Sequence, residues 1–214
     1  ARRLELGASE NYASRGQLKA SAAALANVTV EGYPGVRFLG ASEHVDAIER
    51  LAIERACRLF GSSFANVQPH SGTQANQAVY LALLRPGDTI LSMALTDGGH
   101  FSHGDPESVS GQWFRAVHYR VDPGTGVIDY EQAQQQALAH RPRLVIAGAS
   151  AYPRSIDFER LGAIARSVEA VLMVDIAHVA GLVAAHLFPN PFPHADVVTS
   201  TTYKNLRGVR GGLV

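Results

Sequence analysis

Four groups of polar residues could carry chemistry, and each follows a stretch typical of a β-strand. The first is Ser71-Gly72-Thr73, where two hydroxyls and the backbone N–H groups of a helix start would suit a phosphate. The alternative is that these residues only cap the helix. The segment has no P-loop lysine and does not match the G-x-G-x-x-G pattern, so an ordinary nucleotide is not expected.

A carboxylate and an imidazole are the next two candidates. Asp175 directly follows the apolar run 171–174. A carboxylate at the end of a buried strand should face a cation or several hydrogen-bond donors, although it also suits a helix cap. His100 ends the run Asp97-Gly-Gly-His100, whose glycines would let a ligand approach closely, whereas a lone loop histidine is more often only solvated.

Lys204 is the fourth candidate and ends a polar run, 199–204, that follows another apolar stretch. Among hydroxyls at a strand end its ammonium would be partly desolvated, which favours the neutral amine that attacks a carbonyl. The alternative is a solvated surface charge. A phosphate cradle, a strand-end carboxylate, a loop histidine and a strand-end lysine are together the set that pyridoxal phosphate requires.

The elements that must position these residues alternate between strands and helices. Apolar residues at helical spacing predict a helix over 45–60, ended by Gly61. Further along, the pattern predicts strands at 65–67, 89–93, 114–119, 144–147, 171–174 and 196–199, and helices up to 84 and at 130–140, 158–167 and 178–183. This order predicts an α/β fold with a mostly parallel sheet, helices on both faces and ligand sites at the carboxyl ends of the strands.

Composition narrows the class of protein. The 214 residues include 19 Lys and Arg against 19 Asp and Glu, which gives no reason to expect nucleic acid or an anionic membrane as a partner. The apolar runs are far shorter than the roughly 20 residues that cross a bilayer. The single Cys57 and the lack of zinc-ligand spacing favour a reducing compartment, so we expect a cytoplasmic protein without a metal site.

The chain divides into two unequal parts. Residues 1–44 are rich in Gly, Ser, Asn and Tyr and predict an irregular N-terminal arm with a tight turn at 31–35. Residues 45–214 hold the alternating pattern and contain no linker long enough to divide them.

Six motifs, in order along the chain, resemble the signatures of the serine hydroxymethyltransferase family. They are A-S-E-N-Y (8–12), E-G-Y-P-G (31–35), V-Q-P-H-S-G-T-Q-A-N (67–76), G-G-H (98–100), V-D-I-A-H-V-A-G-L-V (174–183) and K-N-L-R-G-V-R (204–210). The resemblance implies a homodimeric or tetrameric pyridoxal phosphate enzyme of the aspartate aminotransferase fold (fold type I) that moves a one-carbon unit between serine and tetrahydrofolate. It also implies that 45–214 is a truncated large domain, because family members continue past the lysine into a C-terminal domain.

The resemblance assigns the cofactor-binding residues. Lys204 would be the Schiff-base lysine, and Asp175 would be the partner of the pyridine nitrogen. The remaining positions would be Ser71, Gly72 and Thr73 at the phosphate, His100 stacked on the ring, Ser150 and His178 on its 3-hydroxyl side, and Tyr203 beside the lysine.

The resemblance also assigns residues to the amino-acid substrate. Ser9 would face its carboxylate, and Arg210 would order the loop after the lysine. Glu31 would reach in from the neighbouring subunit as an acid or base near the substrate hydroxyl. If Glu31 is partly buried there, it could stay protonated near neutral pH and move a proton at the side-chain oxygen of the substrate.

Three places depart from the family pattern. Thr29 stands where the family has tyrosine, the run 38–41 reads Phe-Leu39-Gly-Ala in place of Tyr-Tyr-Gly-Gly, and Tyr203 and Asn205 flank the lysine in place of His and Thr. Because Glu31 and Lys204 are kept, we expect the cofactor chemistry to survive, and the departures leave a change of substrate or acceptor open.

Three hypotheses follow from these departures. The leading one is serine/glycine hydroxymethyl transfer, which breaks or forms the Cα–Cβ bond of a β-hydroxy amino acid. A threonine transaldolase or an α-methylserine hydroxymethyltransferase of secondary metabolism is the second, and a catalytically silent relative that binds a partner or cofactor is the third.

Overall fold

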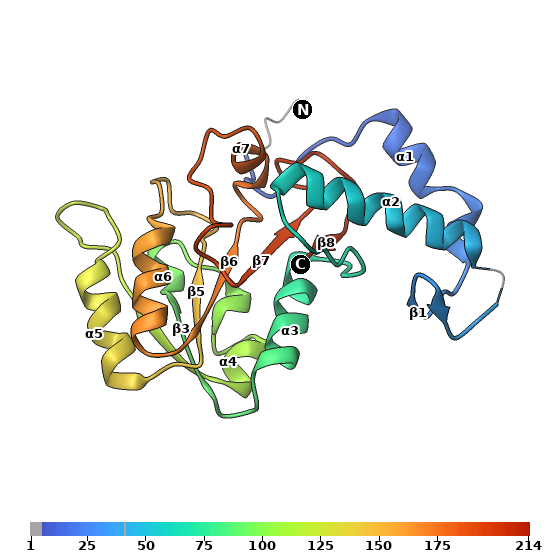
Figure 1. Ribbon diagram of the computed structural model, residues 1–214. Helices are drawn as coiled ribbons and strands as arrows, with labels where there is room; N and C mark the ends of the chain where they lie inside the picture. The colour runs from blue at the N-terminus through green and yellow to red at the C-terminus, as the bar shows by residue number, and fades with distance from the viewer. Residues whose placement is uncertain (1–5, 41) are drawn as a thin grey trace.

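A six-stranded sheet forms the centre of the computed structural model, which describes residues 6–40 and 42–214 (Figure 1). Its strand order is β4-β3-β5-β6-β7-β8. Strands β3 to β7 run parallel, and β8 is antiparallel to β7. Their bounds are Thr89–Met93 (β3), Arg115–Tyr119 (β4), Leu144–Ala147 (β5), Val171–Asp175 (β6), Val197–Thr201 (β7) and Gly212–Leu213 (β8).

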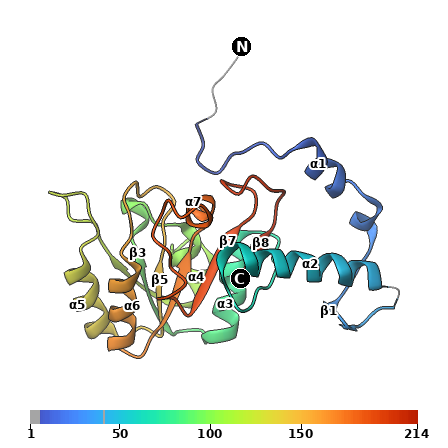
Figure 2. The ribbon, with the colours of Figure 1, turned by 45° about the horizontal axis from the view of Figure 1, so that its top comes forward.

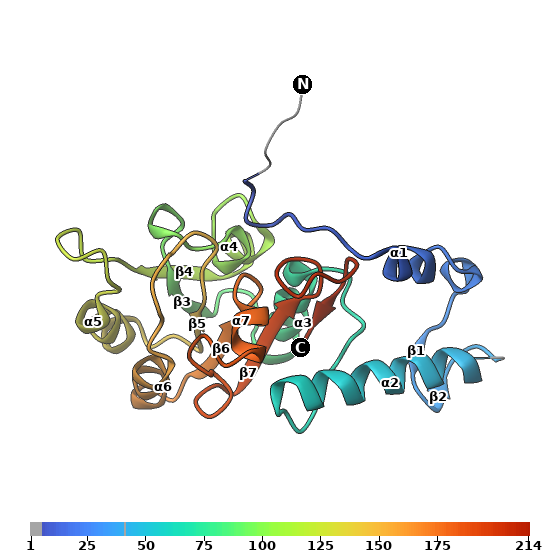
Figure 3. The same cartoon turned by 90° about the horizontal axis from the view of Figure 1, so that it is seen from above.

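Helices cover both faces of this sheet, as the view from above shows (Figure 3). On one side lie α3 (Gly72–Leu83) and α4 (Val109–Trp113). On the other lie α5 (Tyr130–His140) and α6 (Phe158–Ser167), and the short α7 (Ala180–Ala184) follows β6. The predicted α/β class with a doubly covered, mostly parallel sheet is therefore confirmed.

The apolar strands are continuous because both faces of the sheet are buried. Successive side chains of a strand point to opposite faces. Leu144 and Ile146 of β5 thus join the core under α3, while Val145 joins the core under α5 and α6. Asp129 and Asp157 cap α5 and α6 by accepting hydrogen bonds from backbone N–H groups, which explains the sharp starts of these helices.

The N-terminal segment lies beside the long helix α2 (Glu43–Phe60), away from α5 and α6 (Figure 2). It contains α1 (Arg15–Ser21), a 3-10 turn (Ala24–Asn27) and a hairpin of β1 (Gly32–Tyr33) and β2 (Val36–Arg37). None of its described residues up to 40 is buried. Arg37 fastens the hairpin to α2 through hydrogen bonds to Asp46 and Glu49. The division at residue 44 stays a prediction.

Most predicted elements match the structure closely, and the exceptions have physical reasons. The bounds 130–140, 144–147 and 158–167 agree with the structure, and Gly61 ends α2 in a left-handed conformation. The predicted strand 65–67 is wrong. Asn66 exchanges two backbone hydrogen bonds with Val214, but its neighbours do not continue the ladder. The first five residues of the predicted arm, and Ala41 of the divergent run, lie outside the described residues.

Within the described ranges, no helix has the length and apolar character needed to cross a membrane.

Candidate active site

A cavity at the carboxyl ends of β5, β6 and β7 brings most of the predicted cofactor residues together. Ser71 adjoins it, while His103 and Thr201 are lining residues that sequence reasoning missed. The full lining is Gly72, Thr73, His100, His103, Ala149, Ser150, Asp175, Ala177, His178, Thr201, Tyr203 and Lys204. In the described part of the chain, no group of three or more His, Cys, Asp or Glu residues is arranged to hold a metal ion.

Asp175 ends β6, and its side chain is 9% exposed. Its Oδ2 accepts a hydrogen bond from Nδ2 of Asn76 at 2.9 Å and lies 3.0 Å from Nε2 of His103, and its Oδ1 accepts from the Ala177 N–H. Burial by itself raises the pKa of Asp175. The hydrogen bond and charge of His103, with the other two donors, outweigh burial and lower the pKa of Asp175. The carboxylate is therefore ionised at neutral pH.

Lys204 follows β7 and is buried. Its Nζ lies 3.0 Å from Nε2 of His178. Burial lowers the pKa of Lys204, the charge of Arg210 lowers it further, and the charge of Asp175 opposes the shift. Burial, followed by the charge of Lys204, also lowers the pKa of His178, so its neutral ring accepts a hydrogen bond from the lysine. This environment favours the nucleophilic neutral amine.

His100 precedes the 3-10 turn η3 (Phe101–His103). Its Nδ1 accepts a hydrogen bond from the Ser102 N–H at 3.1 Å and lies 2.7 Å from Ser102 Oγ. Burial, with the charge of His103 adding to it, lowers the pKa of His100 from 6.5 to about 4. The ring is therefore neutral at pH 7, and the hydrogen bonds place its proton on Nε2.

The lowered pKa of His100 predicts a pH-dependent stability of the cofactor-free protein. The unfolded chain binds a proton at this ring near pH 6.5 and the folded chain only near pH 4. The contribution of the neutral His100 ring to the free energy of unfolding is thus fully present above pH 6.5 and is lost as the pH falls towards 4. We expect His100→Gln to flatten the pH dependence of the free energy of unfolding in this window, measured by urea titration. The exposed His70→Gln is the control, and an equally steep slope in both variants contradicts the prediction.

The phosphate end of the predicted site lies at the start of α3. Ser71 Oγ caps this helix by accepting from the Gln74 N–H at 3.1 Å, while the N–H groups of Gly72 and Thr73 have no partner among the described residues. Gly72 is needed for close packing on β7, since a Cβ there would lie 2.8 Å from Cγ2 of Thr201. The helix start therefore offers free donors at the cavity wall.

Two buried hydroxyls complete this donor set. Ser150 Oγ and Thr201 Oγ1 have no hydrogen-bond partner in the described part of the chain, although such groups are normally paired. Both residues line the cavity. Free N–H groups, unpaired hydroxyls, an ionised carboxylate and a buried amine match the chemical groups of pyridoxal phosphate, so the residues present fit this cofactor.

The two divergent neighbours of Lys204 have different surroundings. Tyr203 lines the cavity, and the guanidinium of Arg210 lies 4.5 Å from the centroid of its ring, a cation–π contact. Asn205 is not among the residues that line the cavity. It accepts from the Gly181 N–H at 2.9 Å and donates to the His178 carbonyl at 2.7 Å, which joins the lysine loop to the start of α7.

The predicted substrate residues are not gathered at the cavity in the single chain. Ser9, Glu31 and Arg210 are exposed, and so are the divergent Thr29 and Leu39. Glu31 directly precedes the β1–β2 hairpin, which lies beside α2 (Figure 1).

Two contacts tie the N-terminal segment to the lysine loop. Asn11 Nδ2 donates to the Lys204 carbonyl at 2.7 Å, and Arg207 Nε donates to the Tyr12 carbonyl at 2.8 Å. Ser9 is therefore carried on a segment that is fastened next to Lys204.

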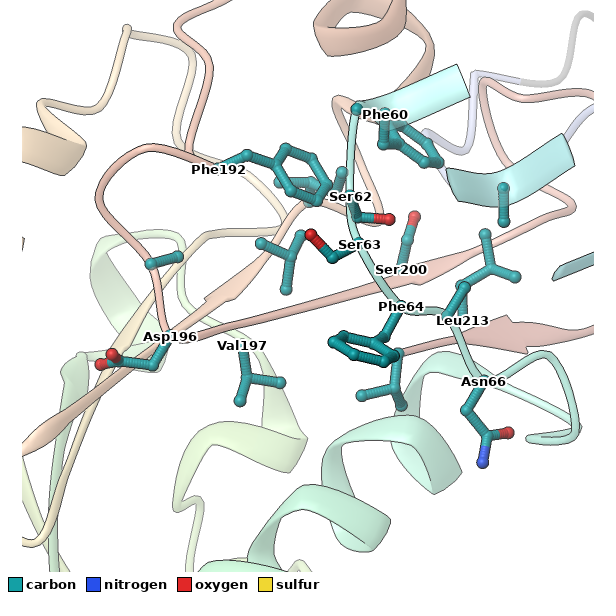
Figure 4. A pocket seen from close by; sticks show the side chains of 17 residues that line it. Phe60, Ser62, Ser63, Phe64, Asn66, Phe192, Asp196, Val197, Ser200 and Leu213 are labelled. Atoms are coloured by element: carbon teal, nitrogen blue, oxygen red, sulfur yellow. The ribbon is translucent and has the colours of Figure 1, made fainter. Parts of the chain in front are cut away.

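A separate cavity of about 590 Å³ lies between the sheet and the segment after α2 (Figure 4). Its wall is mainly apolar and includes Phe60, Phe64 and Phe192. Its carboxylate, Asp196, accepts a hydrogen bond from the Leu172 N–H, and no histidine or lysine is among the described residues that line it. The groups suited to catalysis converge at the other cavity.

The fold and site define a class: α/β proteins whose ligand site, with a buried amine and carboxylate, lies at the carboxyl edge of a doubly covered parallel sheet. Residues 1–214 match the family model described as serine hydroxymethyltransferase. The chain belongs to the serine hydroxymethyltransferase family.

Curated relatives agree with this assignment. The chain is 59% identical over 213 residues to serine hydroxymethyltransferase of Coprothermobacter proteolyticus, and this alignment covers 100% of the chain and 51% of the relative. It is 61% identical over 211 residues to serine hydroxymethyltransferase 2 of Rhodopseudomonas palustris, covering 99% of the chain and 49% of the relative. The chain thus spans about half the length of the curated relatives it matches.

Proposed function

We propose that the full-length protein binds pyridoxal phosphate in the cavity at the carboxyl edge of the sheet and interconverts serine and glycine, with tetrahydrofolate as the one-carbon carrier. The convergence of Lys204, Asp175 and unpaired donors in one cavity carries this proposal. The names of the relatives at 57–61% identity support it.

Each part of the cavity has a role in holding the cofactor. The N–H groups of Gly72 and Thr73 would bind its phosphate, Asp175 its ring nitrogen, and Lys204 its aldehyde carbon. Further contacts would come from Ser71, His100, Ser150, His178, Thr201 and Tyr203. When bound, pyridoxal phosphate supplies the electron sink for the bond that breaks at Cα.

Side chains of the protein would set the charge and the proton positions around the bound cofactor. Asp175, held ionised by three donors, would keep a proton on the ring nitrogen. The neutral ring of His100 would add no charge at the ring face. Nζ of Lys204 and Nε2 of His178, 3.0 Å apart, would pass a proton between them as the amine is released.

The substrate residues imply an oligomer. Ser9 would bind the substrate carboxylate beside Lys204, and Arg210 would order the lysine loop. Glu31 is exposed on the hairpin beyond α2, so we propose that it acts at the cavity of a neighbouring subunit in a homodimer or larger assembly. A cytoplasmic location is part of the same proposal.

The deciding experiment gives the full-length protein pyridoxal phosphate and serine, with and without tetrahydrofolate. We expect visible absorbance from the bound cofactor and glycine formation that depends on tetrahydrofolate. Two results would overturn the proposal in favour of the second hypothesis, if serine gives no glycine. One is acetaldehyde release from threonine in the presence of a foreign aldehyde, and the other is cleavage of α-methylserine. Cofactor absorbance with no turnover of any of these would favour the silent relative.

A further inference from the structure

Asn76 forms the centre of a buried polar network behind the cavity. The residue lies on α3 and is fully buried. Its Nδ2 donates to Oδ2 of Asp175 and to Oγ of Ser102, both at 2.9 Å. The two N–H bonds of one amide are thus both used, and each ends on a different part of the site.

Thr199 holds this amide from the opposite side. Its Oγ1, also buried, donates to Oδ1 of Asn76 at 2.7 Å. A flipped amide would turn Oδ1 towards the Asp175 carboxylate, so that two acceptors would face each other. The Asp175 carboxylate therefore sets the orientation of the amide, and the Thr199 hydroxyl on β7 holds the amide there by donating to its Oδ1.

The second branch of the network reaches His100. Ser102 Oγ accepts from Asn76 and, 2.7 Å from Nδ1 of His100, donates to that unprotonated nitrogen. The Ser102 N–H donates to the same nitrogen, which fixes its role as an acceptor. One amide on α3 therefore connects the carboxylate at the end of β6 with the imidazole before η3.

We propose that Asn76 is a positioning residue that fixes the Asp175 carboxylate and, through Ser102, the His100 ring relative to each other. The inference rests on the proposed function, because it assigns Asp175 to the pyridine nitrogen. Asn76 does not line the cavity and acts only through these partners.

The test measures binding of two probes to the full-length, cofactor-free protein by calorimetry. Pyridoxine 5′-phosphate carries the ring nitrogen and the phosphate but no aldehyde, so Lys204 cannot react with it. Binding of inorganic phosphate measures only the affinity of the N–H groups at the start of α3. We expect Asn76→Ala to weaken binding of pyridoxine 5′-phosphate about tenfold or more, because a buried charge loses a donor, and to leave phosphate binding within about twofold. Asn76→Asp should weaken binding of pyridoxine 5′-phosphate further, since two adjacent carboxylates cannot both ionise.

Tyr80→Phe is the matched control. Tyr80 lies one turn further along α3 and donates to the Ser102 carbonyl at 2.6 Å, so this variant removes a buried hydrogen bond to the same turn without touching Asp175. We expect the ratio of its affinities for pyridoxine 5′-phosphate and inorganic phosphate to equal that of the unmodified protein. An equal loss of both probes in Asn76→Ala would reveal a merely structural role and would overturn the inference.

A second pair of variants avoids changing Asn76. Thr199→Val removes the hydroxyl that holds Oδ1 of the Asn76 amide, whereas Thr199→Ser keeps it. We expect only the valine variant to lose affinity for pyridoxine 5′-phosphate, about tenfold. Unchanged binding in Thr199→Val and Asn76→Ala overturns this inference alone. Failure of the unmodified protein to bind the probe overturns the proposed function as well.

Discussion

Lys204→Ala is expected to lower turnover of serine by at least about 10³-fold, the scale of loss when an enzyme's nucleophile is removed. Lys204 is buried and its Nζ lies 3.0 Å from His178. The alanine variant keeps the carboxylate and the phosphate cradle but has no amine to hold the cofactor aldehyde. Turnover should be measured as glycine formation, and the same sample should lose its visible cofactor absorbance.

The chain offers a natural control for this variant. Its sequence contains two lysines, and the other, Lys19, is exposed on α1. Lys19→Ala removes the same charge from the surface and should leave turnover and absorbance unchanged. Equal turnover in both variants would contradict the assigned role of Lys204.

Gly148→Ala is expected to destabilise the protein by at least about 2 kcal/mol and to weaken cofactor binding. Gly148 follows β5 with a φ of +126°, a conformation that residues with a Cβ rarely adopt. A Cβ there would lie 2.2 Å from the backbone carbonyl oxygen of Asp175. The strand ends must separate to admit the methyl group, and Asp175 would move with them. Urea unfolding and calorimetry with pyridoxine 5′-phosphate measure the two effects.

Gly87→Ala separates backbone strain from the clash. Gly87 also has a positive φ, +92°, but an added Cβ would meet nothing within 4 Å. This variant should lose some stability and keep cofactor affinity. If Gly148→Ala binds as tightly as Gly87→Ala, the contact between the ends of β5 and β6 does not position Asp175.

The sheet and the main site residues follow from local sequence. Asp175 and Lys204 both come after apolar runs, and the carboxyl ends of parallel strands lie at one edge of a sheet. Their meeting was therefore predictable without knowing the helix packing. The sequence left Ser71 open as either a helix cap or a phosphate ligand, and the structure shows that its hydroxyl caps α3.

Other site features depend on contacts between distant segments. His103 and Asn76 reach Asp175 across 72 and 99 residues of sequence. The only local sign of Asn76 was a polar residue on the side of a helix that also carries Tyr80, four positions on. The exposure of Glu31 within one chain does not follow from its motif, because exposure depends on which chain segments lie next to the residue. The wrong strand at 65–67 has a similar cause, because a strand needs a partner over several residues.

The location of Glu31 has a consequence for mixtures of defective chains. Arg37 holds the β1–β2 hairpin on α2 of its own chain, away from the cavity that contains Lys204. If each site takes its lysine from one subunit and its glutamate from the other, Lys204→Ala and Glu31→Gln chains are each inactive as pure dimers. A hybrid dimer of the two would place both defects in one site and leave the other site intact. Genetic complementation between two inactive alleles would then be a property of the assembly.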